Sequence, residues 1–158
     1  MRRKFAKSWR FWSAPCDCQP NNMIERNYYL PRSGPMPRPK DLAEAVEALR
    51  QEAFPAPAVK RVTLHAKEFT AICPRTGQPD FGEVIVEYEP NQLCLESKAF
   101  KFYLWAFRDE GAYCESLAAR IADDLFEVLK PRFLRVVVKQ YPRGGIELEA
   151  EALRYGDE

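Results

Sequence analysis

The stretch Ile72-Cys73-Pro74-Arg75-Thr76-Gly77-Gln78-Pro79-Asp80-Phe81 connects two segments that have the alternating pattern of β-strands. Pro74 and Pro79 fix their own φ angles and bias the residues before them toward extended conformations, so an ordered loop is predicted. The loop carries a thiol and a carboxyl group, Cys73 and Asp80, seven positions apart. This pair suits a nucleophile with a nearby proton donor, whereas a small buried cysteine beside an ordinary turn is the alternative.

Periodic patterns on both sides of the loop predict the fold. Alternation predicts strands at 59–72, 83–88, 133–141 and from 146 onward, and a bulge is expected where Glu68 and Phe69 break it. Helical spacing predicts helices at 97–109 and 114–130, and a short helix capped by Asp41. The order strand, strand, helix, helix, strand, strand predicts an α+β fold: an antiparallel four-stranded sheet with two helices on one face.

The segment 97–109 differs from an ordinary amphipathic helix, because its apolar residues point in every direction around the axis. Such a helix has to be covered on several sides in a small protein. The sheet covers one side only, so we expect a neighbouring subunit to cover another, and hence a homo-oligomer.

Composition divides the 158 residues into a tail and one domain. Residues 1–39 carry eight Arg or Lys against two acidic residues, together with six prolines, and are expected to form a largely irregular basic extension; residues 40–158 form the domain. The net charge of +1 does not indicate a polyanion-binding protein as a whole. Five cysteines without a repeating spacing favour a reducing compartment, so a cytoplasmic location without membrane insertion is expected.

A second informative stretch, Leu95-Glu96-Ser97-Lys98-Ala99-Phe100-Lys101-Phe102-Tyr103, begins the apolar helix. Glu96 lies where backbone N–H groups are free, so it either caps the helix or binds the edge of a heterocycle. Lys98 and Lys101 share a helix face, as a phosphate-binding pair would, although two solvated lysines would look the same.

Three segments together closely resemble the short, single-module 7-cyano-7-deazaguanine reductases of queuosine biosynthesis. They are 69–81, the Glu-Ser-Lys-Ala-Phe-Lys-Phe-Tyr run at 96–103, and Pro-Arg-Gly-Gly-Ile at 142–146. The resemblance spans roughly residues 58–156, and three motifs in the right order are far more specific than any one of them. It implies the tunnelling fold, in which the sheets of several subunits close into a barrel with active sites between subunits, in pentamers that can stack into a decamer.

The resemblance also implies roles for individual residues and an NADPH cofactor. Cys73 matches the thiol that adds to the nitrile carbon to give a thioimide, and Asp80 matches the proton donor. Further residues match the parts that hold substrate and cofactor: Leu95, Glu96, Ser97, Cys114 and Glu115 for the deazaguanine, and, more weakly, Lys98, Lys101, Arg143 and Gly144 for the cofactor phosphates. No metal, membrane or direct tRNA contact is expected.

One position departs from the family pattern, because Cys114 stands where many relatives have a histidine before the glutamate. The role of that histidine therefore cannot be transferred, and a reversible Cys73–Cys114 disulfide is a hypothesis. Two other functions stay open. A metal-dependent cyclohydrolase-like enzyme of the same fold would need Cys and His ligands, and His65 is the only histidine of the chain. A purine-, pterin- or RNA-binding module would not need Cys73 and Asp80.

Overall fold

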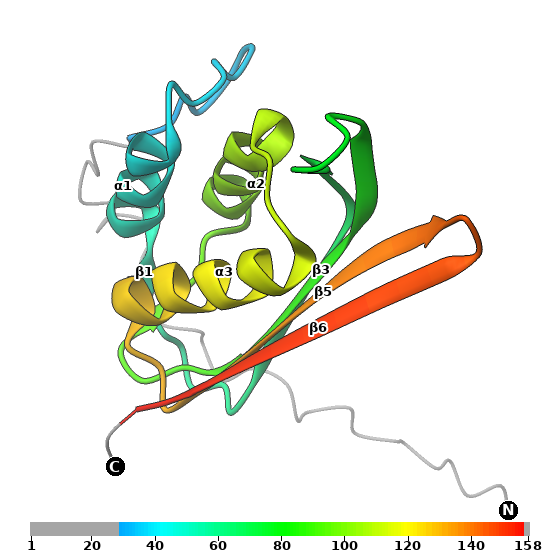
Figure 1. The fold of residues 1–158 in the computed structure, drawn as a ribbon. Helices are drawn as coiled ribbons and strands as arrows, with labels where there is room; N and C mark the ends of the chain where they lie inside the picture. The colour runs from blue at the N-terminus through cyan, green and yellow to red at the C-terminus, as the bar shows by residue number, and fades with distance from the viewer. Residues whose placement is uncertain (1–28, 157–158) are drawn as a thin grey trace, which may run out of the picture.

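A computed structural model describes residues 29–156, and its main sheet is built from two hairpins (Figure 1). The strand order is β2-β3-β5-β6 and every pairing is antiparallel. The four strands are β2 (Val62–Ile72), β3 (Pro79–Glu89), β5 (Phe133–Arg143) and β6 (Ile146–Tyr155). The predicted sheet is confirmed, and so is the bulge, because the β2–β3 register shifts between Ala66 and Phe69. β3 begins earlier than predicted, since Pro79 already pairs with Ile72.

The two faces of the sheet have different compositions. One face is apolar and packs under the helices; its central residues are Val84, Val86, Leu134, Val136 and Val138, all fully buried. The opposite face carries a ladder of ion pairs in which two basic residues of β5 each pair with acidic residues of both β3 and β6. The pairs are Arg135 with Glu87 and Glu151, and Lys139 with Glu83 and Glu149.

The helices begin and end where local sequence signals predict. They are α1 (Leu42–Glu52), α2 (Ser97–Trp105), which continues as the 3₁₀ helix η1 (Ala106–Asp109), and α3 (Cys114–Leu129). Asp41 caps α1 as predicted, accepting a hydrogen bond from the Glu44 N–H at 2.8 Å. α3 ends at Lys130, which adopts a left-handed conformation just before Pro131.

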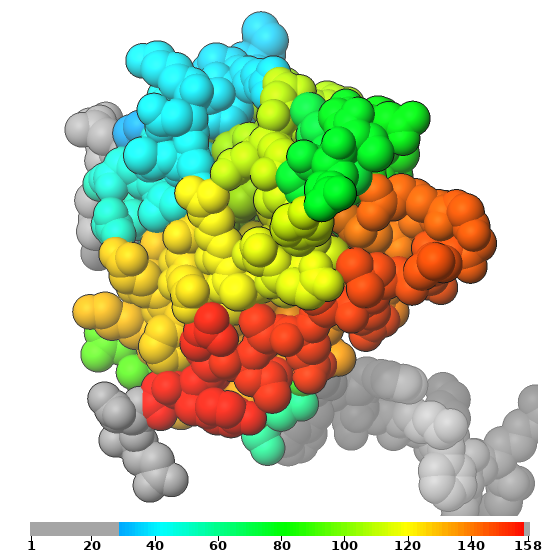
Figure 2. Space-filling view, in the orientation of Figure 1, coloured from blue at the N-terminus to red at the C-terminus, as the bar shows by residue number. Residues whose placement is uncertain are grey.

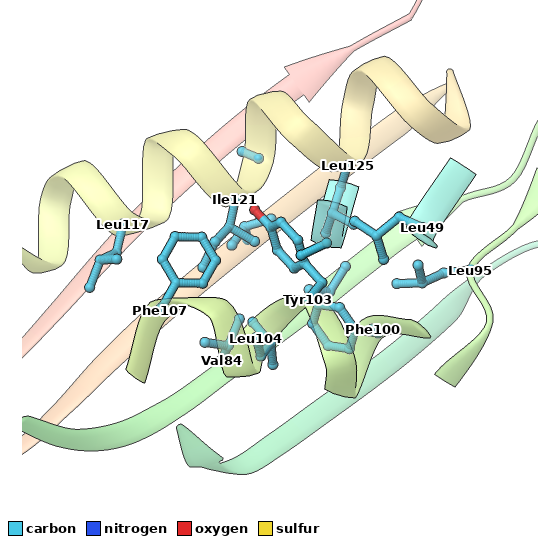
Figure 3. Packing of buried hydrophobic residues seen from close by; sticks show 14 of the residues in the cluster. Leu49, Val84, Leu95, Phe100, Tyr103, Leu104, Phe107, Leu117, Ile121 and Leu125 are labelled. Carbon is cyan, nitrogen blue, oxygen red and sulfur yellow. The ribbon is translucent and has the colours of Figure 1, made fainter. Parts of the chain in front are cut away.

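The apolar helix α2 is covered within its own chain. α1 packs on one side of it, and β2 lies on another. Phe100, Tyr103 and Phe107 meet residues of α3 and the sheet in one cluster (Figure 3). The Tyr103 hydroxyl points to α3 and donates to Asp124 at 2.6 Å. The inference that this helix needs a neighbouring subunit was therefore wrong, because it left out α1 as a cover; the expected oligomer rests on the family resemblance alone.

Two features near the N-terminus were not predicted. A two-stranded sheet joins β1 (Phe54–Pro55) to β4 (Leu93–Cys94), and it anchors the connection that leads into α2.

The second feature is the docking of residues 29–40, which we had assigned largely to the extension. Leu30 is buried, and its N–H donates to Glu52 at 2.6 Å, while Arg38 pairs with Asp109. Residues 1–28 lie outside the described part of the chain. None of the helices within residues 29–156 is long and apolar enough to cross a membrane.

Candidate active site

Cys73 and Asp80 lie on the same face of the sheet at the end of the β2–β3 hairpin. Asp80 pairs with Ala71 on β2, and Cys73 follows two positions later, so both side chains point to the side that carries the helices. Diagonal neighbours of this kind have Cβ atoms about 7–8 Å apart at most, within reach of one small substrate. The turn is closed by the Cys73 N–H on the Gln78 carbonyl at 2.8 Å and the Gly77 N–H on the Cys73 carbonyl at 2.9 Å.

The Cys73 thiol is partly exposed and is activated by hydrogen bonds from its own turn. The Thr76 hydroxyl contributes most, followed by the backbone N–H groups of Arg75 and Thr76, and together they lower the pKa of Cys73 to about 7. Burial opposes this shift, and a hydrogen bond from Arg143 adds a smaller lowering. About half of the thiol is therefore ionised near neutral pH, which makes it a competent nucleophile.

Asp80 is a buried carboxylate, 3% exposed, whose two oxygens are both hydrogen-bonded. Arg143 Nη1 donates to Oδ1 at 2.6 Å, and Gln140 Nε2 donates to Oδ2 at 3.2 Å. Arg143 Nη2 also donates to Gln140 Oε1 at 3.2 Å, so the three side chains form a closed ring. The ion pair compensates the cost of burying the charge of Asp80.

A glycine on the central strand allows this ring to form. Gly82 pairs with Gln140 across β3 and β5, and a Cβ atom at Gly82 would lie 1.9 Å from the Lys139 carbonyl oxygen. Real Cβ atoms do not approach so closely, so the two strands would have to separate. A register shift between Gln140 and Arg143 then interrupts the β5–β6 ladder just before the turn.

Among the residues that the structure describes, three segments form the end of the molecule that carries Cys73 and Asp80. Figure 2 shows the β2–β3 turn in green and the tip of the β5–β6 hairpin in orange at the same end of the molecule, with the start of α3 between them. Tyr113, just before α3, is exposed there, as are Tyr141 and Ile146 on the hairpin. Exposed aromatic and aliphatic side chains thus lie on the segments that form this end of the molecule.

Cys114 at the start of α3 lies behind this cluster. Its thiol is 1% exposed and donates to the Val138 carbonyl at 3.3 Å. Burial, followed by the negative charges of Glu115 and Asp80, raises the pKa of Cys114 to about 11. The thiol stays protonated at neutral pH and points into the protein, so it is poorly placed for the predicted contact with substrate; the neighbouring Glu115 is exposed.

The predicted heterocycle-binding segment lies at the other end of the sheet. The Leu95 N–H donates to the buried Tyr88 hydroxyl at 2.8 Å, and Glu96 caps α2 by accepting the Ala99 N–H at 2.7 Å. Asp80 and Tyr88 are eight positions apart on β3, roughly 26 Å at the rise of an extended strand. Within one chain, Leu95, Glu96 and Ser97 therefore lie too far from Cys73 to contact the same substrate.

The candidate cofactor residues are divided in the same way. Lys98 and Lys101 project from the first turns of α2; Lys98 Nζ donates to the Pro31 carbonyl at 3.1 Å, and Lys101 is exposed. Gly144 forms the β5–β6 turn at the opposite end, with φ +58°. Arg143, which precedes it, is bound to Asp80.

Sequence reasoning missed Thr76 and Gln140, which act on Cys73 and Asp80, and it missed Tyr88, which holds Leu95 at the other end of the sheet. The signal for Gln140 was present, since it continues the buried alternation Leu134, Val136, Val138 as its only polar member. A polar side chain at an apolar position of a strand implies a buried partner. Within residues 29–156, no cluster of three or more His, Cys, Asp or Glu side chains has the geometry to hold a metal ion.

Comparisons with known proteins agree with this architecture. A solved structure described as the archaeosine synthase QueF-Like in the apo form matches with a TM-score of 0.59 and 27% identity, over 65% of this chain and all of that chain. NADPH-dependent 7-cyano-7-deazaguanine reductases of Nitrosospira multiformis and Thiobacillus denitrificans are 48% and 47% identical over 98 residues. Each of these two alignments covers 60% of this chain and 70% of the relative.

The family model described as QueF-like protein matches residues 79–157, half of the chain. Its range includes Asp80, Gln140 and Arg143, and begins after Cys73. The predicted family, the tunnelling type of α+β fold and the relatives' names therefore agree. The chain belongs to the QueF-like family.

Proposed function

We propose that this protein is an NADPH-dependent reductase that converts the nitrile of 7-cyano-7-deazaguanine into the primary amine of 7-aminomethyl-7-deazaguanine, for queuosine modification of tRNA. The relatives carry this reductase name. The observation that carries the proposal is the pairing of a partly ionised thiol, Cys73, with a buried carboxyl group, Asp80, on one face of one hairpin.

Covalent activation explains why a thiol and a carboxyl group are needed together. A nitrile is a poor hydride acceptor, and addition of the Cys73 sulfur to its carbon gives a thioimide with an electrophilic C=N bond. In this step the sulfur–carbon bond forms, one π bond of the nitrile breaks, and the nitrogen takes up a proton. Asp80 is the group that delivers the proton: its carboxylate takes the proton of the Cys73 thiol and passes it to the nitrogen, because it lies near the thiol on the neighbouring strand.

The residues that would hold the cofactor are basic side chains and the positive end of α2. Lys98 and Lys101 fit phosphate groups, because both are basic residues in the first two turns of this helix. Gly144 offers bare backbone at the β5–β6 turn, whereas Arg143 fits less well because its guanidinium contacts Asp80 and Gln140. When bound, NADPH supplies the hydrides, two for each nitrile reduced to an amine.

We further propose that each active site is shared by two subunits of a homo-oligomer. Cys73 and Asp80 lie one sheet length from Leu95 and Glu96, so a second copy has to bring its α2 start to the first copy's hairpin if both bind one substrate. The family resemblance supports this assembly, with pentamers or a decamer as the expected form.

The activity is tested by mixing the protein with 7-cyano-7-deazaguanine and NADPH and following the loss of cofactor absorbance. Cys73→Ala and Asp80→Asn are expected to abolish or strongly reduce this loss. Mass spectrometry of the unmutated protein with nitrile alone should show an adduct on Cys73. No NADPH oxidation and no adduct would refute the proposal.

The shared site is tested by complementation between two variants that are inactive alone. Cys73→Ala destroys the thiol half, and Glu96→Gln removes the charge of the other half while keeping an oxygen for the helix cap. Co-assembly of the two variants should restore part of the activity, because some sites then receive both intact halves. A mixture no more active than its parts would place the whole site within one chain.

A further inference from the structure

Three side chains near Cys73 form a unit that the proposed chemistry has not used in full. Asp80, Gln140 and Arg143 are joined by the closed ring of hydrogen bonds, in which every side-chain oxygen of the three accepts a donor. Asp80 is almost fully buried, whereas half of the Arg143 side chain is exposed. The carboxylate is therefore held from two sides and cannot rotate without breaking at least one of these bonds.

The backbone makes this arrangement specific. Gln140 reaches Asp80 because Gly82 lets β5 approach β3, and Arg143 reaches it because the register shift follows Gln140 directly. A surface ion pair would need none of these features. The ring is thus a consequence of how three strands meet at this end of the sheet.

Arg143 also acts on the second reacting group. Its guanidinium donates a hydrogen bond that lowers the pKa of Cys73, in addition to its ion pair with Asp80. A thiolate and a carboxylate that lie on adjacent strands repel each other, which disfavours having both ionised. The Arg143 guanidinium, which binds Asp80 and lowers the pKa of Cys73, offsets this repulsion.

We propose that Gln140 and Arg143 are positioning residues, which fix the Asp80 carboxyl group beside Cys73 for the addition of the nitrile; this rests on the function proposed above. Arg143 serves both groups, and Gln140 serves Asp80 alone. This assignment replaces the sequence-based expectation that Arg143 holds a cofactor phosphate.

The test measures adduct formation on Cys73 from 7-cyano-7-deazaguanine without NADPH, by mass spectrometry over time and at several nitrile concentrations. Arg143→Gln and Gln140→Met are the main variants, Arg143→Lys is the conservative one, and Arg154→Gln is the matched control. Arg154 also pairs with an aspartate, Asp123 of α3, but near the end of β6 that lies opposite the β5–β6 turn.

Arg143→Gln should slow the maximal adduct rate about 10- to 100-fold, the loss expected when a reacting group is misplaced by about 1 Å, while half-saturation by nitrile changes little. Arg143→Lys should recover part of this rate, because it restores the charge but not the two-armed contact. Gln140→Met should also slow the reaction, and Arg154→Gln should not.

A second measurement without nitrile separates the two residues. The pH dependence of Cys73 alkylation by iodoacetamide should move to higher pH in Arg143→Gln and stay unchanged in Gln140→Met, because Arg143 lowers the pKa of Cys73 and Gln140 does not act on it. Urea unfolding identifies variants that no longer fold. If Arg143→Gln does not fold, the adduct rate and the alkylation pH profile of Arg143→Lys test the role of Arg143 in its place.

An unchanged adduct rate in Arg143→Gln, with a higher NADPH concentration needed for turnover, would overturn the inference and return Arg143 to the cofactor. A uniform loss in which every variant, the Arg154→Gln control included, slows equally would overturn it too. If the unmutated protein forms no adduct at all, the proposed function fails instead, and the role of Arg143 beside the thiol is then decided by the iodoacetamide profile.

Discussion

Replacing Thr76 by valine should raise the pKa of Cys73, because the Thr76 hydroxyl is the strongest of the groups that lower it. Valine keeps the size and β-branching of threonine, so the turn should be preserved while the hydroxyl is lost. The two backbone N–H donors and Arg143 remain, so the pKa is expected to rise only part of the way from about 7 toward its ordinary range.

The magnitude follows from two opposing effects. A rise of about one unit lowers the ionised fraction at pH 7 from about one half to about one tenth, whereas each thiolate becomes roughly threefold more reactive as its basicity increases. The alkylation rate by iodoacetamide should therefore fall only about twofold at pH 7 and exceed that of the unmutated protein about threefold above pH 9. The diagnostic result is that the plots of alkylation rate against pH for Thr76→Val and for the unmutated protein cross.

The assay records alkylation of Cys73 by peptide mass spectrometry between pH 5 and 10, because Cys94 and Cys114 are buried and react slowly. Thr63→Val is the matched control, since Thr63 is an exposed threonine on β2 far from the turn. An inflection that stays near pH 7 in Thr76→Val, or that moves equally in Thr63→Val, would refute the account of thiol activation.

Three further predictions concern stability and are measured by urea unfolding. Tyr88→Phe leaves the Leu95 N–H without its acceptor and should lower the free energy of unfolding by about 1–3 kcal/mol; no change would contradict the buried hydrogen bond. Gly82→Ala should cost about 1–3 kcal/mol or more, because its Cβ atom would collide with the Lys139 carbonyl, and full stability would show that the strands are not so close. Burial raises the pKa of Asp124, so ionising it costs stability as pH rises from about 4 upward; Asp124→Asn should remove this part of the pH dependence, and an identical slope would refute it.

Local patterns were sufficient to predict the helices and the four-stranded sheet, because most of these elements have an uninterrupted period and a clear end signal; the short β1–β4 pair has neither. Asp41 at the start of α1 and Pro131 after α3 are examples. The burial of α2 could not be predicted in the same way, because it depends on contacts with α1, which is distant in the sequence and has no local signal for packing there.

The candidate site was predicted unevenly for a similar reason. Cys73 and Asp80 flank one turn, so their proximity follows from a hairpin; their catalytic roles stay predictions. The link from Asp80 to Arg143 joins residues 63 positions apart and depends on a register shift that no local pattern predicts. Glu96 was correctly offered as a helix cap, but its distance from Cys73 appears only once β3 is seen to run the full length of the sheet.

The docking of residues 29–40 changes where this protein can be shortened. Composition places the boundary near residue 40, yet removal of everything before it would expose the part of the core that Leu30 covers. It would also take from the buried Glu52 carboxylate the donor that now compensates its burial. A trimmed form that keeps Tyr29 onward retains both contacts, so a truncation has to spare Leu30 even though this residue lies within the proline-rich composition.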